Sequence, residues 1–277
     1  MDKPFLKWVG GKTQSIDIII SKIPNFILNY HEIFLGGGSV LLKLLSLQKE
    51  GKIEIRNKVY AYDINDRLIN LYKHIQSDKD KLMYHINFLQ NTYNKSSDKK
   101  CLYYKNRILF NQIDRDSIES SALFMFLNKT GFRGMYRENM KGGFNVPYGN
   151  YKNELCIITK EKLDYISDLI KEVKFVHCHY RKALLNIKFG DFIYLDPPYF
   201  PGNCSKFVKY TRYGFTYDAH IELFTTIKEI KWATILMSNS NTDEVKKHFK
   251  KYEIIETKRR INPKNPESTT TELLISV

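Results

Sequence analysis

The sequence predicts an α/β fold built on an open, mostly parallel sheet with helices on both faces. Two observations favour this fold class. Short apolar strand candidates alternate with helical patterns at both ends of the chain, an order that is typical of parallel sheets. The middle of the chain, from about residue 78 to residue 158, breaks this alternation, which indicates an insertion into the part that forms the sheet.

The strand and helix candidates follow one another along the chain. Five short apolar runs predict parallel strands at residues 31–35, 59–63, 173–180, 192–196 and 233–238. Five helical patterns predict helices at residues 13–23, 40–48, 64–76, 160–170 and 218–230. The last two strand candidates, 252–258 and 272–277, flank a polar loop that contains two prolines, and we expect them to pair as an antiparallel hairpin.

Residues 71–171 are predicted to form an inserted domain, and residues 1–70 and 172–277 the domain that carries the sheet. The insert begins with charged helical segments and continues into a glycine-rich stretch that predicts a hairpin over about residues 131–152. Cations alternate there with aromatic rings: Arg133, Arg137 and Lys141 with Phe132, Tyr136 and Phe144. Such a mixture suits phosphates, base edges and stacked bases. The alternative, a solvated basic loop, is weaker because it would expose the rings without compensation.

The charge of the chain narrows the class of partner. The formal net charge is +14 and the sequence pI is about 9.4, which favours a polyanion, with nucleic acid first and an anionic membrane surface second. The alternative is that the excess of lysine and arginine only keeps the protein soluble and marks no polyanionic partner. No apolar run reaches membrane-spanning length and the N-terminus lacks a secretory apolar segment. We therefore expect an intracellular protein, in the cytoplasm or nucleoid, or in the host cell if its source is viral.

The cysteines and histidines do not predict a metal site. The four cysteines are scattered and form no CxxC pair, so neither a zinc site nor a disulfide framework is expected. The run His177-Cys178-His179 falls in a strand candidate. Within a strand, its two histidines would point to one face and the cysteine to the other, so the three side chains could not reach one ion.

One tetrapeptide, Asp196-Pro197-Pro198-Tyr199, ends an apolar strand candidate at the edge where open α/β sheets bind ligands. Each proline fixes its own φ and restricts the preceding residue, so the Asp196 carboxylate and the Pro197 carbonyl are held rigidly. Two such acceptors suit an aromatic amine whose lone pair must be directed at a methyl donor, and Tyr199 can stack on its ring. Average composition gives this tetrapeptide by chance in roughly one protein in a thousand. A structural turn is therefore the weaker interpretation.

Two further motifs fit a donor that contains a nucleoside. Phe34-Leu35-Gly36-Gly37-Gly38 follows a strand candidate and opens a helix, where glycines allow a ligand close to the backbone. Asp63 ends the next strand candidate, a position suited to ribose hydroxyls. Each signal is weak alone, because glycine turns between strand and helix are common. The run from Val9 to Thr13 ends like a phosphate-binding P-loop, but Leu6 stands where its first glycine is required.

Taken in order, these motifs resemble those of the DNA adenine methyltransferase (Dam) family over nearly the whole chain, and the run from Phe5 to Lys12 is similar to the family's N-terminal motif. The resemblance implies a Rossmann-like class I methyltransferase sheet with an inserted, mainly helical DNA-recognition domain that carries a β-hairpin. It implies N6 methylation of an adenine flipped out of duplex DNA, with S-adenosylmethionine as donor, S-adenosylhomocysteine as product and no metal. The donor-binding residues implied are Trp8, Lys12, Phe34, Gly36, Gly38, Asp63, His179, Tyr180 and Asp196, and the catalytic ones are Asp196, Pro197, Pro198 and Tyr199.

The same resemblance implies a DNA-contacting set: Lys7, Phe132, Arg133, Met135, Arg137, Pro147 and Tyr151. Arg133 stands where well-known members carry asparagine, and Met135 replaces a leucine that touches a base, while GATC is the family's commonest site. A cognate restriction endonuclease is a possible partner. Two alternatives remain open at this stage. One is an amino-methyltransferase acting on RNA or on another base, and the other is a DNA-binding homologue that has lost catalysis.

Overall fold

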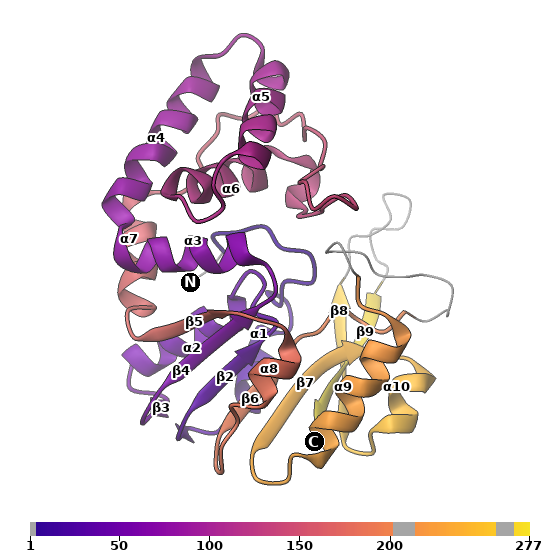
Figure 1. The fold of residues 1–277 in the computed structure, drawn as a ribbon. Helices are drawn as coiled ribbons and strands as arrows, with labels where there is room; N and C mark the ends of the chain where they lie inside the picture. Colours follow the sequence, from indigo (N-terminus) through magenta and orange to yellow (C-terminus); the bar gives the residue numbers. More distant parts are fainter. Residues whose placement is uncertain (1–3, 202–213, 259–268) are drawn as a thin grey trace.

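A computed structural model describes residues 4–201, 214–258 and 269–277 and confirms the predicted fold class (Figure 1). The large sheet of the described residues has the strand order β5-β4-β2-β6-β7-β9-β8. Its strands are β2 Tyr30–Ile33, β4 Val59–Asp63, β5 Val173–His177, β6 Phe192–Leu195, β7 Thr234–Ser240, β8 Tyr252–Lys258 and β9 Thr269–Ser276. The first five are parallel, whereas β9 runs antiparallel to both β7 and β8. A separate two-stranded sheet pairs β1 Phe26–Ile27 with β3 Glu54–Ile55.

The order of the strands creates a switch point between β2 and β6. From β2 the chain moves outward to β4 and then β5, and it returns to β6 on the other side of β2. Ligands of open α/β sheets bind at the carboxyl ends of the strands beside such a point. Ile33 pairs with Leu195 across these two strands. The glycine turn that begins at Phe34 and the tetrapeptide that begins at Asp196 therefore leave the sheet side by side.

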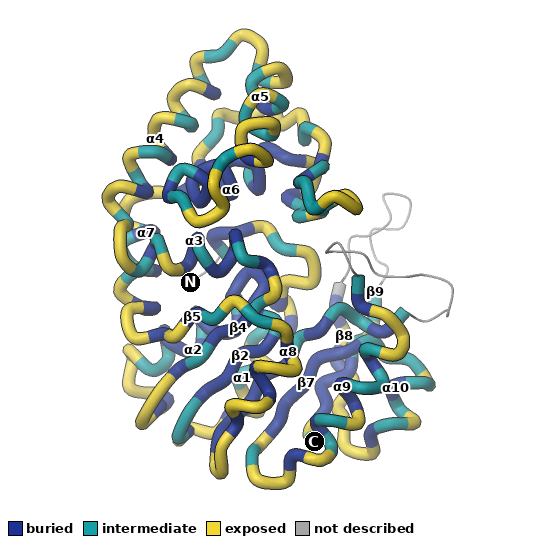
Figure 2. Tube along the Cα trace, viewed as in Figure 1, coloured by how far each residue is buried: buried dark blue, intermediate teal, exposed yellow. Residues whose placement is uncertain are grey.

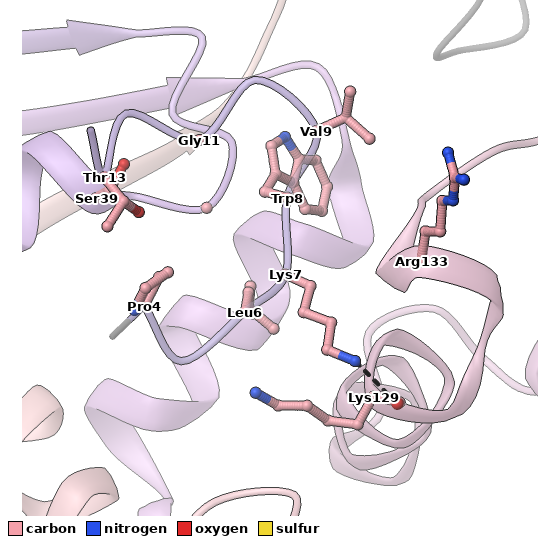
Figure 3. Close-up of a pocket in the computed structure, with 11 residues that line it drawn as sticks. Pro4, Leu6, Lys7, Trp8, Val9, Gly11, Thr13, Ser39, Lys129 and Arg133 are labelled. Atoms are coloured by element: carbon pink, nitrogen blue, oxygen red, sulfur yellow. Dashed lines mark hydrogen bonds between the residues drawn. The ribbon is translucent and has the colours of Figure 1, made fainter. Parts of the chain in front are cut away.

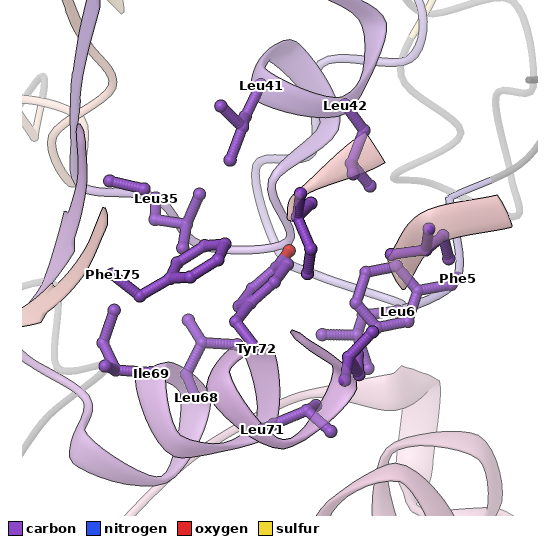
Figure 4. Close-up of a cluster of buried hydrophobic side chains, with 14 of the residues drawn as sticks. Phe5, Leu6, Leu35, Leu41, Leu42, Leu68, Ile69, Leu71, Tyr72 and Phe175 are labelled. Atoms are coloured by element: carbon purple, nitrogen blue, oxygen red, sulfur yellow. The ribbon is translucent and has the colours of Figure 1, made fainter. Parts of the chain in front are cut away.

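Helices cover both faces of the sheet. On one face lie α1 Ile16–Ser21, α2 Ser39–Lys49, α3 Asp66–Ser77 and α7 Lys160–Leu169, and on the other lie α8 Tyr180–Leu184, α9 Tyr217–Glu229 and α10 Asp243–His248. Alternate residues of β6 enter the two apolar clusters: Phe192 and Tyr194 pack into the first, Ile193 and Leu195 into the second. Figure 4 shows the first cluster, where α2 and α3 meet the N-terminal segment.

The insert forms a helical layer beyond the sheet in Figure 1. It contains α4 Lys79–Lys95, α5 Lys99–Gln112, α6 Ile118–Thr130 and the short 3-10 helix η1 Phe132–Gly134. Almost every residue of α6 is buried, because this helix packs against α3, α4 and α5 at once. Figure 2 shows that α4 and α5, by contrast, each carry an exposed face. The first apolar cluster continues into these helices, so the insert and the sheet share one core.

Three predicted elements differ from the observed ones by three residues at one end, and the others by no more than two. The strand predicted at 173–180 ends at His177, because the His179 side chain accepts a hydrogen bond from the Arg181 amide and caps α8. The helix predicted at 13–23 covers only Ile16–Ser21, and Pro24 prevents its continuation. The C-terminal strands pair as predicted, although β9 begins earlier, at Thr269. The tip of that hairpin lies outside the described residues.

The β-hairpin predicted at 131–152 is not a ladder of regular strands. The segment has two isolated antiparallel bridges, Gly131 with Tyr148 and Glu138 with Phe144. The two bridges are out of register with each other, and η1, with its left-handed φ of 55° at Arg133, interrupts one arm between them, so one continuous ladder cannot form. The Asn111 side chain on α5 exchanges two hydrogen bonds with the backbone of Phe144 on the edge that faces away from Glu138, and so docks the segment on α5. We refer to residues 131–152 below as the recognition loop.

Candidate active site

The Asp196 carboxylate is held by one cation and keeps one oxygen free. Its Oδ2 lies 2.6 Å from Nζ of Lys12, which also donates to the Gly10 carbonyl at 2.6 Å. Its Oδ1 is buried and has no hydrogen-bond partner in the described part of the chain. Burial raises the pKa of Asp196 to about 6, and Lys12 opposes that rise. The result is a carboxylate near neutral pH with one unused acceptor atom.

The chain beyond the prolines is anchored by the two neighbouring strands. The Phe200 amide donates to Oδ1 of Asn239 at 3.0 Å, and Oγ of Ser240 donates to the Phe200 carbonyl at 2.7 Å, so β7 holds both backbone groups of that residue. The Tyr199 hydroxyl donates to Oε2 of Glu272 on β9 at 2.8 Å. Sequence reasoning missed all three partners. No motif marks them, because they approach the tetrapeptide only through the pairing of β6, β7 and β9.

A cavity of about 180 Å³ lies at the switch point, far larger than one water molecule requires. Its walls include Trp8, Phe34, Asp63 and Asp196. Asp63 ties the two loops together, since its carboxylate accepts hydrogen bonds from the amides of Gly36 and Asn65, each at 2.9 Å. The strand ends thus bring an acid, two aromatic rings and the tetrapeptide to one opening.

The glycines of the turn allow Trp8 to lie directly on the backbone. A Cβ added at Gly36 would stand 2.7 Å from Nε1 of Trp8, and one added at Gly37 would stand 2.9 Å from the Trp8 Cβ. Gly38 has a left-handed φ of 63° and packs against the Tyr72 hydroxyl instead. Gly36 lines the cavity, and its contact with a donor remains a prediction, whereas Gly38 is not among the described lining residues and packs behind the turn.

Glu32 is a second carboxylate in this cavity, and sequence reasoning missed it. It lines the cavity while being only 2% exposed, and Oη of Tyr30 donates to its Oε2 at 2.7 Å. Burial raises the pKa of Glu32 to about 8. The signal was present in the sequence, because a charged residue inside a strand buried on both faces needs a special reason.

Two residues that were expected to surround the donor lie behind the wall of the cavity rather than in it. The Tyr180 ring packs against Phe34 with centroids 5.6 Å apart, and His179 is exposed beside Tyr180 at 4.4 Å. Neither is among the described residues that line the cavity, whereas Phe34 is. In this structure Tyr180 supports Phe34, and contact of either residue with a donor remains a prediction.

A second cavity, of about 430 Å³, opens on the other side of Trp8, between the N-terminal segment and the insert (Figure 3). Lys7, Lys129 and Arg133 bring three cations to it. Lys7 is exposed, whereas burial and the neighbouring Lys7 lower the pKa of the Lys129 ammonium to about 8. Such an opening suits an anion rather than an apolar ligand.

Most residues predicted to contact DNA lie close together beside this cavity. The Phe132 ring is 41% exposed, and the Arg133 guanidinium lies 5.3 Å from its centroid. The Pro147 carbonyl accepts from the Phe132 amide at 2.8 Å. The Tyr151 hydroxyl donates to the Gly131 carbonyl at 3.2 Å, and Nζ of Lys7 lies 4.1 Å from the Tyr151 ring. Pro147 and Tyr151 thus brace the recognition loop.

The two residues predicted to read bases are placed differently from each other. Arg137 is exposed, and its Nε donates to Oδ1 of Asn145 at 2.7 Å on the facing side of the recognition loop. Met135 is half-buried and packs against the core of the insert, beside Phe110 and Phe144. The exposed guanidinium of Arg137 is accessible to a partner, although its Nε and Nη2 already donate to Asn145, whereas Met135 offers only part of its side chain.

The described ranges 4–201, 214–258 and 269–277 contain no group of three His, Cys, Asp or Glu side chains that could hold a metal ion. No helix within them is long and apolar enough to cross a membrane. Cys204 lies outside these ranges.

The sheet is parallel except for its reversed C-terminal strand β9, and its cavity and the Asp-Pro-Pro-Tyr loop lie at the switch point. These features place the protein in the class of Rossmann-like methyltransferases. Comparison with known proteins identifies its family within this class. The model of the D12 class N6 adenine-specific DNA methyltransferases matches residues 8–262, and the chain belongs to that family. The predicted function is thereby confirmed: the protein is an N6-adenine-specific DNA methyltransferase, and its substrate is DNA rather than RNA.

Several curated proteins are similar over almost their whole length. The Type II methyltransferase M.MjaIII of Methanocaldococcus jannaschii is 38% identical, over 95% of this chain and 93% of its own. The Type II methyltransferase M1.LlaDCHI of Lactococcus lactis is 31% identical, over 99% of this chain and 95% of its own. A DNA adenine methylase of Vibrio cholerae is 30% identical, over 90% of this chain and 85% of its own.

Proposed function

We propose that the protein takes its methyl group from S-adenosylmethionine, which the family implies, and transfers it to an adenine flipped out of duplex DNA at a specific sequence. The observation that carries this proposal is that Asp196 lines the cavity and that its buried Oδ1 has no hydrogen-bond partner among the described residues. When bound, the donor supplies an electrophilic methyl group. The lining of the cavity suits such a molecule chemically, since Asp63 can accept from ribose hydroxyls and the Trp8 and Phe34 rings can flank a nucleoside.

Asp196 and Pro197 would orient the amine that is methylated. Oδ1 of Asp196 and the Pro197 carbonyl each accept one of its hydrogens, which turns the nitrogen lone pair out of the base plane. The ionised carboxylate also stabilises the positive charge that develops on this nitrogen as its bond to the methyl group forms and the methyl–sulfur bond of the donor breaks. The nitrogen would then release one of its two hydrogens to solvent as a proton, which leaves the neutral methylated amine. Tyr199, whose hydroxyl is fixed by Glu272, presents its ring for stacking on the flipped base. Lys12 keeps Asp196 ionised from the opposite side.

Residues 71–171 would serve recognition and residues 1–70 with 172–277 catalysis. Flipping is required because the target amine is paired inside the duplex. Phe132 and Arg133 project from the recognition loop next to the Lys7 cation, an arrangement that suits insertion beside a duplex. Arg137 would read a base edge. The two relatives named as Type II methyltransferases support a cognate restriction endonuclease as partner. The protein would act in the compartment that holds this DNA.

Expression in a methylation-free host, followed by mapping of modified adenines, tests this proposal. A single enriched sequence motif is expected, and the Asp196→Ala variant should leave the DNA unmodified while still binding donor through Asp63 and the glycine turn. GATC is the first motif to look for. Modified RNA, another modified base, or DNA binding without any methyl incorporation would each contradict the proposal.

A further inference from the structure

Tyr136 belongs to the recognition loop but faces the donor cavity. It stands in the sequence between Met135 and Arg137, the two residues predicted to read bases. Its own ring lines the cavity at the switch point together with Trp8 and Asp196. Among the described residues that line this cavity, Tyr136 alone comes from the insert. The wall of the cavity is therefore completed by the segment expected to touch DNA.

The Tyr136 ring joins a cluster of three nearly parallel aromatic rings. Its centroid lies 6.0 Å from that of Trp8, with 22° between the planes, and 5.4 Å from that of Phe124, with 25° between the planes. Trp8 and Phe124 complete the cluster at 6.2 Å and 17°. Because Trp8 also lies on the turn at Gly36 and Gly37, its position depends on contacts on both sides. A movement of Tyr136 must alter the packing of Trp8 in the cavity.

Tyr136 is tied to the parts of the recognition loop on its DNA side. Its hydroxyl donates to Oε1 of Glu138 at 2.7 Å, and Glu138 forms the isolated bridge with Phe144. The next residue, Arg137, is fixed to Asn145 by its side chain and by the backbone, since the Asn145 amide donates to the Arg137 carbonyl. A base that engages Arg137 therefore acts on the same short stretch of backbone that positions the Tyr136 ring.

We propose that Tyr136 is a donor-binding residue supplied by the recognition loop, and that it couples donor binding to DNA binding. This inference rests on the proposed function of the cavity and the loop. Donor in the cavity fixes the Trp8 and Tyr136 rings, and so favours the loop arrangement that presents Arg137. By linkage, DNA must raise the donor affinity by the same factor as donor raises the DNA affinity.

The test measures binding in a thermodynamic cycle. S-adenosylhomocysteine serves as a non-reactive probe of the cavity, and a duplex with the motif mapped in the methylation-free host serves as DNA. The Kd of each is measured with and without the other. Trp8 and Trp232 are the two tryptophans of the chain, so a Trp232→Phe background makes Trp8 the single fluorescent reporter of the cavity.

Tyr136→Ala should raise the Kd of S-adenosylhomocysteine without DNA by roughly 2- to 10-fold, the range that one aromatic pair supplies. It should also bring the coupling factor toward 1. Tyr136→Phe keeps the ring and should retain most of the donor affinity. Tyr84→Ala is the matched control, because Tyr84 lies on α4 of the same insert, is 70% exposed and is remote from the lining residues. It should leave both quantities unchanged.

Tyr136→Leu provides a second variant if Tyr136→Ala does not fold, because it keeps apolar volume and removes the aromatic face. Wild-type donor affinity in the variant that folds would overturn the proposal, and so would weaker donor binding with an unchanged coupling factor. These outcomes differ from failure of the proposed function. In that case the wild-type protein itself would bind neither S-adenosylhomocysteine nor the duplex.

Discussion

Nζ of Lys12 lies 2.6 Å from Oδ2 of Asp196, and the lysine side chain is only 4% exposed. The pair joins the N-terminal segment to the end of β6 and leaves Oδ1 of Asp196 without a hydrogen-bond partner among the described residues, in a side chain that lines the cavity. A buried carboxylate next to a buried ammonium has a charge that depends on its partner. The ionisation state of the proposed catalytic carboxylate is therefore controlled by a residue of the N-terminal segment, far from it in the sequence.

The pH profile of methyl transfer should report this pair. The active form is the Asp196 carboxylate, so kcat/KM should fall as the pH drops through the pKa of about 6, approaching tenfold per unit below it. Burial raises that pKa and Lys12 lowers it, so Lys12→Met should move the acid limb to higher pH, whereas Lys12→Arg should largely preserve it. Measurement of kcat/KM from pH 5 to pH 9 checks this. An acid limb that stays in place in Lys12→Met would contradict the assignment.

The stability of the ligand-free protein should depend on pH through Glu32. Its pKa is about 8 in the folded protein and 4.5 in the ordinary state. The unfolded chain releases this proton at lower pH than the folded chain. The contribution of protonated Glu32 to the free energy of unfolding is therefore fully present below pH 4.5. It is lost as the pH rises toward 8, by up to about 1.4 kcal/mol per pH unit.

Glu32→Gln removes that titration and keeps an acceptor for the Tyr30 hydroxyl. Thermal or urea unfolding of both proteins at several pH values between 5 and 8 isolates the contribution, because all other groups titrate in both. The stability advantage of the variant should grow with pH. A difference that is constant across the range would show that Glu32 is already ionised in the folded protein.

Residues next to a strand end were predictable from the sequence, because the pattern of apolar residues determines where a strand stops. Asp63 and Asp196 stand where expected for this reason, with the prolines after Asp196 reinforcing the stop. The fold class followed from the same alternation. Glu32 could also have been predicted, because an acidic residue inside a buried strand is unusual, but the sequence does not indicate that Tyr30 is its hydrogen-bond partner.

Contacts that depend on the tertiary arrangement were not predictable from the pattern. The Tyr199 hydroxyl meets Glu272 only because β9 inserts between β7 and β8. The recognition loop is a second example, because its predicted β-hairpin did not form as a regular ladder. Its glycines and alternating rings favour a hairpin, but η1 interrupts one arm and the two bridges fall in different registers. The left-handed φ of 55° at Arg133, a residue that is not glycine, could not be predicted from the pattern.

Asn128 on α6 should be required to dock the N-terminal segment on the insert. Its Oδ1 accepts from the Lys7 amide at 2.9 Å, and its Nδ2 donates to the carbonyls of Lys7 at 2.6 Å and Gly134 at 3.1 Å. Asn128→Ala leaves these buried groups unpaired, so it should lower the free energy of unfolding by about 1–3 kcal/mol and raise the KM for duplex. Urea unfolding and steady-state kinetics check both. Asn186→Ala, at an exposed position, is the control; equal effects of the two substitutions would refute the role of Asn128.

Gly38 and Tyr72 should behave as a coupled pair. The Tyr72 hydroxyl is buried without a hydrogen-bond partner among the described residues, and it would lie 2.2 Å from a Cβ at Gly38, whose φ is 63°. Gly38→Ala should therefore destabilise the protein by about 1–2 kcal/mol for the left-handed backbone, with the steric clash in addition. Tyr72→Phe removes an unpaired hydroxyl and should leave stability unchanged or raise it by about 1 kcal/mol.

The double variant separates the two contributions. Once the hydroxyl is gone, the nearest atom of residue 72 to the new Cβ is Cζ, at 3.1 Å. Gly38→Ala should then cost less in the Tyr72→Phe background than in the wild-type protein, because only the backbone strain and a mild contact remain. Urea unfolding of the four proteins gives the coupling free energy directly. Strict additivity would mean that the turn moves away from Tyr72 when Gly38 is replaced, and that the tyrosine does not hold it.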